Sequence, residues 1–268
     1  MKIHSHYLVD AKGKVRLKQH ATADTGDYKS QDETKPVLEQ HRKRLTELQE
    51  VLYAGAERGL LVVLQGMDTA GKDGTIQHIF SGVNPQGCDV TPFKVPTSVE
   101  AHHDFLWRCH NAVPARGMIG IFNRSHYEDV LSPRVHGVMK DRVAHQHMEQ
   151  INDFESMLAD NGIAVLKFFL HISQEEQKRR LQARIDDKNK HWKLSASDFA
   201  ERVFWDKYQA CYEDIFTRTS KKNAPWFVIP SDEKWFRNVA VSGILVEVLE
   251  SMKLKYPPTT VDVASLKL

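Results

Sequence analysis

Residues 66–75, Gly-Met-Asp-Thr-Ala-Gly-Lys-Asp-Gly-Thr, have the residue types and the spacing of a phosphate-binding loop. They fit the frame G-x-x-x-x-G-K, they follow an apolar segment of strand length, and a helix is expected to begin at Lys72. Glycines let the backbone wrap around phosphate oxygens, and the amide N–H groups at a helix N-terminus attract anions. A simple turn with a solvated lysine is disfavoured by these flanks, so we predict that Lys72 contacts a transferred phosphoryl group. The loop residues predicted to bind phosphate are Gly66, Ala70, Gly71, Lys72, Asp73, Gly74 and Thr75.

Two carboxylates belong to this loop, Asp68 inside it and Asp73 directly after the lysine. The second position usually carries a Ser or Thr whose hydroxyl binds Mg²⁺. Carboxylates beside phosphate would repel it unless a divalent cation lies between them. We therefore expect Asp68 to hold Mg²⁺, or Mn²⁺ in its place, or to orient the acceptor oxygen; stabilisation of the turn is the alternative. For Asp73, phosphate binding and a purely favourable charge at a helix N-terminus are equally consistent.

A second polar cluster follows another apolar, strand-like segment. Asn123 could coordinate a metal ion as a neutral ligand, and Arg124 could neutralise charge on the transferred group in the manner of an arginine finger. Because Arg124 and Glu128 would emerge at the carboxyl edge of a parallel strand, we predict that both are functional. For Asp129, a solvated charge behind a helix N-cap at Ser125 is the favoured interpretation.

These side chains need elements to position them, and the sequence alternates between two kinds. Strands are predicted at residues 60–65, 88–93, 117–122, 164–171 and 226–229. Helices are predicted at residues 36–55, 99–109, 141–160 and 235–252, with two more beginning at residues 72 and 173. The alternation indicates parallel β-α-β units, and hence an α/β fold with a three-layer α/β/α P-loop kinase core.

Three regions are distinguished along the chain. Residues 1–35 are polar and charged, and we expect an arm that lies on the domain or is partly disordered. Residues 36–268 form the P-loop kinase domain. Within it, residues from about 177 to 222 are rich in Arg, Lys and Trp, have a helical pattern and show no strand signal, which indicates a helical lid.

The lid segment carries a stripe of basic residues and several aromatic residues. Arg180, Arg184, Lys188 and His191 share one helical face at spacings of four, four and three. Such a stripe suits a substrate with many phosphates, and a solvated face explains it equally well. Four aromatic residues have a spacing that favours burial in the lid over stacking on a base: Trp192, Trp205, Tyr208 and Tyr212.

The composition excludes several classes of protein. The chain has 268 residues, of which 41% are hydrophobic and 27% charged, and a formal net charge of +2, as in an ordinary globular protein. No apolar stretch approaches the ~20 residues of a membrane span, and the N-terminus lacks the apolar segment of a signal peptide. Three separated cysteines fit a reducing compartment, so we expect a cytoplasmic protein without a membrane partner. Histidine spacing predicts no zinc site, and no G-x-S-x-G elbow is present.

Taken together, the loop and the second cluster resemble the motifs of the family-2 polyphosphate kinases. Residues 66–75 resemble their G-x-D-x-x-G-K-D-G loop, and residues 122–131 (FNRSHYEDVL) resemble their second motif. Ordinary nucleotide kinases share the loop but not the S-H-Y-E-D segment. The similarity continues through residues 190–193, 205–214, 224–226 and 234–238.

This resemblance implies an activity and a set of roles. The family transfers a terminal phosphate between inorganic polyphosphate and a nucleotide with Mg²⁺, using an α/β/α core and a helical lid. By analogy Asp68, Lys72 and Arg124 carry the transfer, and the H-Y-E-D form with Glu128 is similar to the class III branch. That branch acts on nucleoside mono- and diphosphates, which implies a reversible conversion of AMP to ADP to ATP at one site.

The resemblance also implies partners. Arg180, Arg184 and Lys188 would line the path of inorganic polyphosphate, and the acceptor would be an adenine or another purine nucleotide. Apolar helices outside the core suggest a homo-oligomer, a dimer or a tetramer. No nucleic-acid partner is expected, because no basic patch is interleaved with aromatic residues and no N-K-x-D guanine-binding motif occurs.

The sequence disfavours two other functions. An ATP-dependent nucleoside monophosphate kinase would need a purine pocket on the donor side, and the sequence shows no sign of one. A nucleotide-dependent switch or a nucleic-acid-binding ATPase is disfavoured by the missing motifs. The leading interpretation is in-line transfer without a covalent intermediate, with catalysis by positioning and by cations around the equatorial oxygens.

Overall fold

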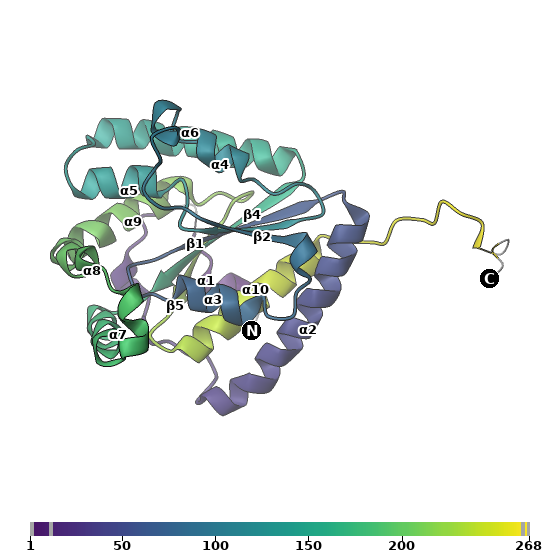
Figure 1. Ribbon diagram of the computed structural model, residues 1–268, viewed down its shortest axis with the longest axis horizontal. Coiled ribbons are helices and arrows are strands. Elements are labelled where there is room, and N and C mark those ends of the chain that lie inside the picture. The colour runs from purple at the N-terminus through teal and green to yellow at the C-terminus, as the bar shows by residue number, and fades with distance from the viewer. Residues whose placement is uncertain (1–2, 11–12, 264–265, 267–268) are drawn as a thin grey trace.

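A strand that is buried along its whole length, β1 (Gly59–Gln65), lies at the centre of a five-stranded parallel sheet. The computed structural model describes residues 3–10, 13–263 and 266. The strands run in the order β2-β3-β1-β4-β5 (Figure 1). The other four are β2 (Cys88–Pro92), β3 (Ile119–Asn123), β4 (Ile163–His171) and β5 (Trp226–Pro230). Because β1 is covered on both faces, it is apolar throughout instead of alternating.

Helices cover both faces of the sheet, which confirms the predicted three-layer α/β/α core (Figure 1). On one face α10 packs against β5, α2 and α3; on the other, α6 packs against β4, α5 and α9. The helices are α1 (Ile3–Tyr7), α2 (Gln31–Gly55), α3 (Lys72–Ile79), α4 (Trp107–Asn111), α5 (Glu128–Val135), α6 (Asp141–Asp160), α7 (Gln174–Asp186), α8 (Ala196–Ala200), α9 (Trp205–Thr219) and α10 (Lys234–Ser251). In α6 the buried residues recur at helical spacing on one side only, whereas α10 is buried nearly all round between its neighbours.

The predicted strands and long helices are confirmed, with two differences. The prediction of a single helix at residues 99–109 is wrong. A 3₁₀ helix covers only Glu100–His102, and α4 begins at Trp107. Local capping causes the break, because Thr97 and Glu100 cap each other and the Asp104 carboxylate accepts the N–H of Leu106. The first long helix also begins at Gln31, before the predicted proline, with two acidic residues in its first turn.

The described part of the N-terminal arm lies against the domain. Tyr7, Val9 and Leu17 are buried, and Leu8 pairs with Phe227 as an isolated antiparallel bridge. The arm therefore covers the outer edge of β5. Residues 1–2 and 11–12 of the predicted arm lie outside the described residues.

The segment predicted as a lid consists of short helices at the end of the molecule that carries the phosphate loop (Figure 1). It begins with α7 and continues through a 3₁₀ helix at Lys188–Lys193, α8, a second 3₁₀ helix at Glu201–Phe204 and α9. At its start the Ser173 hydroxyl accepts the N–H of Glu176, as the capping pattern predicted. Within residues 3–10, 13–263 and 266, no helix is long and apolar enough to cross a membrane.

Candidate active site

The phosphate loop joins β1 to α3 and turns through left-handed backbone conformations. Thr69 has φ 65° and Gly71 has φ 104°. At Gly71 a Cβ atom would lie 2.0 Å from Nη1 of Arg237, so this position needs glycine for space as well as for its dihedral angle. Tight turns of this kind direct backbone amides towards a bound anion.

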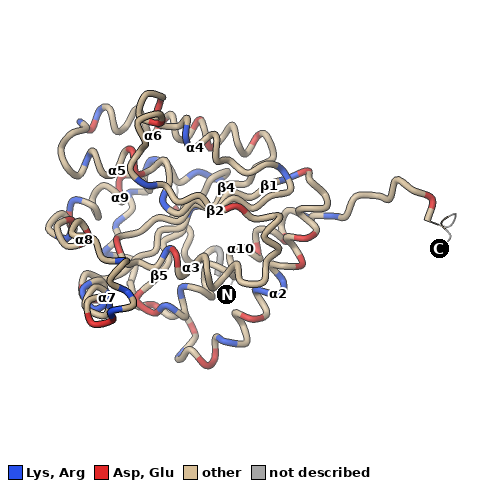
Figure 2. The backbone as a smooth tube through the Cα atoms, in the orientation of Figure 1, with Lys and Arg blue, Asp and Glu red and all other residues tan. Residues whose placement is uncertain are grey.

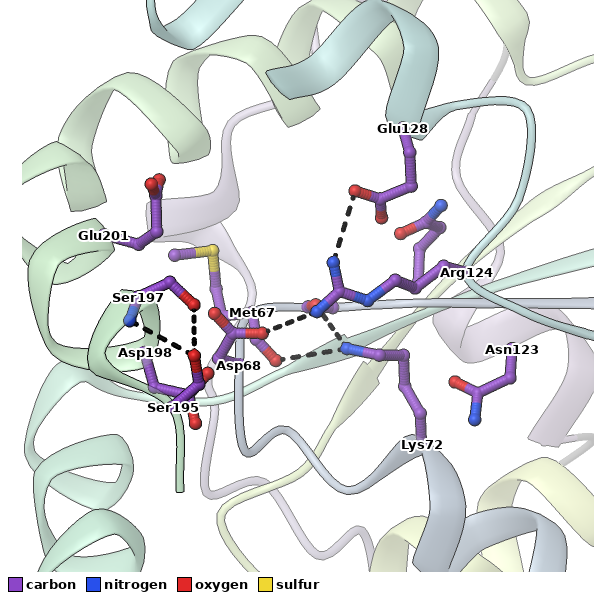
Figure 3. A network of polar contacts seen from close by, with 12 residues as sticks. Met67, Asp68, Lys72, Asn123, Arg124, Glu128, Ser195, Ser197, Asp198 and Glu201 are labelled. Atoms are coloured by element: carbon purple, nitrogen blue, oxygen red, sulfur yellow. Dashed lines mark hydrogen bonds and ion pairs between the residues drawn. The ribbon is translucent and has the colours of Figure 1, made fainter. Parts of the chain in front are cut away.

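Lys72, the first residue of α3, is buried under this loop. Its Nζ donates to the carbonyl oxygen of Gly66 (2.8 Å) and lies 3.4 Å from that of Met67 (Figure 3). Burial, with a contribution from the charge of Arg124, lowers the pKa of the Lys72 ammonium to about 8. The group is therefore mostly charged at neutral pH, and it loses its proton more easily than an ordinary lysine.

Arg124 lies between two carboxylates from different elements (Figure 3). Its Nη2 donates to Oδ1 of Asp68 (2.9 Å), and its Nη1 forms an ion pair with Oε2 of Glu128 (3.6 Å). The backbone of Arg124 is left-handed, with φ 64°, and its N–H donates to the carbonyl of Leu64 on β1. Strained backbone of this kind persists where the surroundings fix it, often at functional sites. The structure thus brings three of the four predicted catalytic residues into direct contact, and the charge of Lys72 acts on all three.

Glu128 is the first residue of α5, and Gln65, the last residue of β1, forms a hydrogen bond with its side chain. The side-chain amide of Gln65, in the orientation that satisfies both of its ends, donates to Oε1 of Glu128 (2.9 Å) and accepts from Ser125. Burial raises the pKa of Glu128, and the charges of Arg124 and Lys72 offset part of that rise. Ser125 is not the helix N-cap that the sequence suggested; it is buried, and its hydroxyl accepts the N–H of Tyr127.

The prediction for Asp129 is wrong, because this carboxylate is not a solvated charge. Its Oδ2 accepts from Nη2 of Arg108 (2.8 Å), whose side chain is buried and also donates to the carbonyl of Lys94. The pair fixes the first turn of α5 to α4. No local pattern points to it, since the two residues are separated by 21 positions.

Asp73 and Asn123 contact each other beside Lys72. Nδ2 of Asn123 donates to Oδ1 of Asp73 at 2.7 Å. The side-chain oxygen of Asn123, Oδ1, is therefore left available as a ligand. Among the residues that the structure describes, no group of three or more His, Cys, Asp or Glu side chains is arranged to hold a metal ion. A carboxylate such as Asp68 and an amide oxygen are hard donors, and Mg²⁺ typically takes one or two of these and fills its shell with water and substrate phosphates. The residues present therefore fit a divalent cation that binds together with its substrate.

Two arginines brace the outer side of the loop. Arg180 of α7 is buried, and its Nη1 donates to the carbonyls of Thr69 and Ala70, both at 3.0 Å. Arg237 of α10 donates to the same Ala70 carbonyl at 3.1 Å, and burial beside Arg180 lowers its pKa to about 9. Arg237 was not predicted as a site residue. The sequence signal that could have indicated its role is that it is the one arginine of a mostly apolar helix.

A cavity of about 750 Å³ lies between this braced side of the loop, α2, α3, α10 and the lid. Many of its lining side chains are basic, and Figure 2 shows the Lys and Arg residues gathered on α7. They include Lys35, Arg180, Arg184, Lys190, Lys193 and Arg237. Lys188 is exposed and is not among the lining residues, so its predicted role stays a prediction.

A second, smaller cavity of about 40 Å³ lies on the other side of the same loop. Asp68, Glu128 and Glu201 line it together with Arg124, and Tyr208 donates to Oε2 of Glu201 at 2.8 Å. Tyr212 also lines it and is buried, as predicted for the lid aromatics, but that prediction is wrong for Trp192, which is 78% exposed. The Asp68–Arg124 contact therefore lies at a small cavity with three carboxylates and one arginine, and the loop separates it from a large basic one.

Comparison with known proteins gives a consistent result. The family model described as polyphosphate kinase 2 (PPK2) matches residues 28–257. An AMP/ADP-polyphosphate phosphotransferase of Meiothermus ruber is 47% identical to this chain over 252 residues, which cover 94% of each chain. An ADP-polyphosphate phosphotransferase of Rhodopseudomonas palustris is 42% identical over 259 residues, which cover 92% of this chain and 90% of the relative. The crystal structure of polyphosphate kinase 2 from Arthrobacter aurescens TC1 superimposes with a TM-score of 0.95 at 41% identity, covering 99% of this chain and 95% of that one.

Proposed function

The chain belongs to the polyphosphate kinase 2 family, and from this premise we propose that it transfers the terminal phosphoryl group of inorganic polyphosphate to nucleoside mono- and diphosphates. The reaction converts AMP to ADP and ADP to ATP, and it is reversible. One observation carries the proposal: a single phosphate loop separates a large basic cavity from a small cavity lined by Asp68, Arg124 and Glu128.

The basic cavity is the donor side in this proposal. Polyphosphate is a chain of anions without a base, so it needs room and distributed positive charge. Arg184, Lys190 and Lys193 of the lid face Lys35 and Arg237 of the core across this cavity. Arg180 contributes mainly its charge, because each of its guanidinium nitrogens already has an acceptor within the protein.

The transfer itself takes place at the junction of the two cavities. An oxygen of the acceptor phosphate attacks the terminal phosphorus of the donor, a P–O bond to the acceptor forms, and the bridging P–O bond to the remaining chain breaks. Lys72 and Arg124 balance the charge on the equatorial oxygens, and Asp68 orients the acceptor and holds Arg124 in place. Glu128 holds the other side of the guanidinium.

A divalent cation, which we propose to be Mg²⁺ or in its place Mn²⁺, would neutralise charge between the phosphate oxygens when it is held by Asp68 and the carbonyl oxygen of Asn123. This assignment is supported by the hard donor atoms at the loop and by the repulsion that Asp68 would otherwise exert on phosphate. Residues 177–222 act as the lid in this proposal. A purine base, a homo-oligomeric assembly and a cytoplasmic location stay predictions from the sequence.

The experiment compares two donors with one acceptor. Purified protein is incubated with Mg²⁺ and AMP, with either long-chain polyphosphate or ATP as donor, and nucleotides are separated by chromatography. We expect ADP and then ATP with polyphosphate. Product only with ATP would replace the proposal by a nucleoside monophosphate kinase, whereas the two similar proteins described above are polyphosphate phosphotransferases. An Asp68→Asn variant with full activity would remove that residue from the mechanism.

A further inference from the structure

Between Arg124 and Glu128 the chain directs three side chains into the protein interior: Ser125, His126 and Tyr127. His126 and Tyr127 are both 0% exposed. Nε2 of His126 lies 3.1 Å from Oε1 of Glu155 on α6, and the Tyr127 hydroxyl donates to the same oxygen at 2.9 Å. The middle of the second motif is thus attached to the core, although neither residue lines the two cavities described above.

A fully buried lysine completes this arrangement. Lys167 of β4 donates from Nζ to Glu155, to the Tyr127 hydroxyl (2.9 Å) and to the carbonyl of Thr219 on α9 (2.8 Å). Its charge also lies 5.3 Å from the ring centroid of Trp226. An ammonium in a dry interior is costly unless all its donors are satisfied, and here all three are used. Glu155 of α6, Tyr127 and Thr219 of α9 therefore converge on the Lys167 ammonium of β4.

We propose that His126, Tyr127, Glu155 and Lys167, which we call the buried anchor, are positioning residues that hold Arg124 between Asp68 and Glu128. Arg124 has left-handed backbone that persists only when both of its sides are fixed. Its N–H is fixed to Leu64 on the amino side, and the buried anchor begins two residues later on the carboxyl side.

The buried anchor acts through Arg124, so its effect differs from that of an ordinary core contact. Fully paired buried networks specify one arrangement of the elements they join. A 1 Å displacement of a catalytic group can lower a rate by about 10²-fold without loss of the fold. This inference rests on the proposed function only for its kinetic test.

The kinetic test is a double-mutant cycle between Tyr127→Phe and Arg124→Ala. Tyr127→Phe removes one hydroxyl and keeps the ring, and we expect kcat to fall by about 10-fold with KM for AMP changed by less than about 2-fold. In the Arg124→Ala background the same substitution should change the remaining rate by less than about 2-fold, because the group that it positions is gone. Equal losses in both backgrounds would show that the buried anchor only stabilises the fold.

Two further variants separate positioning from stability. Ile151→Val, a buried residue one turn before Glu155 on α6, is expected to lower Tm by ~2–4 °C and to leave kcat unchanged. The pair Glu155→Leu with Lys167→Met removes both charges together, which avoids leaving one of them unpaired. Because His126, the Tyr127 hydroxyl and the Thr219 carbonyl lose a buried partner, Tm should fall, but the variant should remain folded at 25 °C by circular dichroism and lose about 10²-fold in kcat. A folded pair variant with wild-type kcat would overturn the inference.

A readout without nucleotides tests the same inference independently. The backbone amide of Glu128 donates to the carbonyl of Ser125, and that of Arg124 donates to Leu64. In Tyr127→Phe we expect hydrogen exchange at these two amides to rise by about 10-fold, while amides of α10 keep their wild-type rates. Unchanged exchange at both would overturn the inference even if the enzyme is active, whereas an inactive wild type with faster exchange in the variant would overturn the proposed function alone.

Discussion

The two cavities that share the phosphate loop differ in size and in charge. The larger one borders Thr69, Gly71 and Gly74 and is lined by lysines and arginines from the lid, α2 and α10. The smaller one borders Gly66, Met67 and Asp68 and offers one arginine among three carboxylates. Under the proposed function, the first cavity attracts a polymer of phosphates by its distributed positive charge, and the second offers one arginine to the phosphate of an acceptor.

This contrast explains why one loop can serve two substrates that both present phosphate. Its glycine backbone and Lys72 recognise phosphate without regard to the rest of the molecule. Under the proposed function, discrimination comes from the residues that line each cavity, which we call the donor wall and the acceptor wall: distributed positive charge for the donor, and Arg124 among carboxylates for the phosphate of the acceptor. Variants that alter the lining of one cavity and not that of the other test this difference.

The largest effect is expected at the junction. Arg124→Ala should lower kcat by about 10³–10⁵-fold, the range for a transferred phosphoryl group that loses its arginine, with KM for polyphosphate little changed. Initial rates at saturating AMP and polyphosphate provide the measurement. Arg142→Ala, which removes an exposed arginine of α6, is the matched control and should behave as wild type. If Arg124→Ala instead raised only KM for polyphosphate, Arg124 would bind the donor, and the proposed difference between the two cavities would be wrong.

A pH profile tests Lys72, which is buried under the loop that separates the two cavities. With a pKa lowered to about 8, Lys72 loses its charge above that pH, and kcat/KM should fall by about tenfold per pH unit there. The unfolded chain would bind this proton up to its ordinary pKa of 10.5, so the contribution of Lys72 to stability rises from pH 8 to 10.5. Activity and stability thus change in opposite directions, which separates this loss from unfolding.

The matched variant for that profile is Lys72→Arg. A guanidinium stays charged throughout this range, so the variant should be less active at neutral pH, because its geometry differs, and should lack the fall above pH 8. If the fall persists in Lys72→Arg, another group is responsible for it.

The sequence predicted the parts of the site that are encoded locally. The loop from Gly66 to Thr75 and the residues Arg124 and Glu128 each lie at the end of an apolar strand, and parallel strands bring such ends together. The strands β1, β3, β4 and β5 were recognisable because burial on both faces demands continuous apolar residues, whereas β2 at the edge is partly exposed and gave a weaker pattern. Only the helix expected at residues 99–109 failed outright, since capping by Thr97 and Asp104 divides it.

Contacts between distant segments could not be predicted in this way. Arg237 reaches the Ala70 carbonyl from 167 positions away, and the pairing of Arg108 with Asp129 depends on how α4 is placed beside α5. Lys167 was part of a predicted strand, and nothing in its neighbours indicates that its ammonium would be paired inside the core. Such pairs arise from packing, which a single sequence does not specify.

A moderate effect is expected on the donor wall. Arg184, 25% exposed at its side chain, lines the basic cavity, whereas Lys188 on the same predicted stripe does not. Arg184→Ala should raise KM for polyphosphate by about tenfold, the loss of one charge-assisted contact, and leave KM for AMP unchanged. Lys188→Ala is the matched control, with both constants near wild type. Equal effects of the two substitutions would mean that the stripe is recognised as diffuse charge rather than through this cavity.

The smallest effect is expected on the acceptor wall, where Glu128 shares Arg124 with the acceptor. A diphosphate brings one more phosphate to Arg124 than a monophosphate does, so a carboxylate on the same guanidinium affects the two acceptors unequally. Glu128→Asn should lower the rate with AMP relative to that with ADP by about 3–10-fold. Because burial raises the pKa of Glu128, its protonation begins at a higher pH than for an ordinary glutamate, and acidification should shift the wild-type ratio in the same direction.

Two comparisons decide whether that ratio belongs to Glu128. In Glu128→Asn the ratio should no longer respond to acidification, because the titrating carboxyl is gone. Asp129→Asn alters the neighbouring carboxylate, which pairs with buried Arg108, so it should lower Tm and leave the AMP-to-ADP ratio at its wild-type value. A ratio that is unchanged in Glu128→Asn, or shifted equally in Asp129→Asn, would show that the acceptor wall distinguishes mono- from diphosphates by its shape and not by the charge beside Arg124.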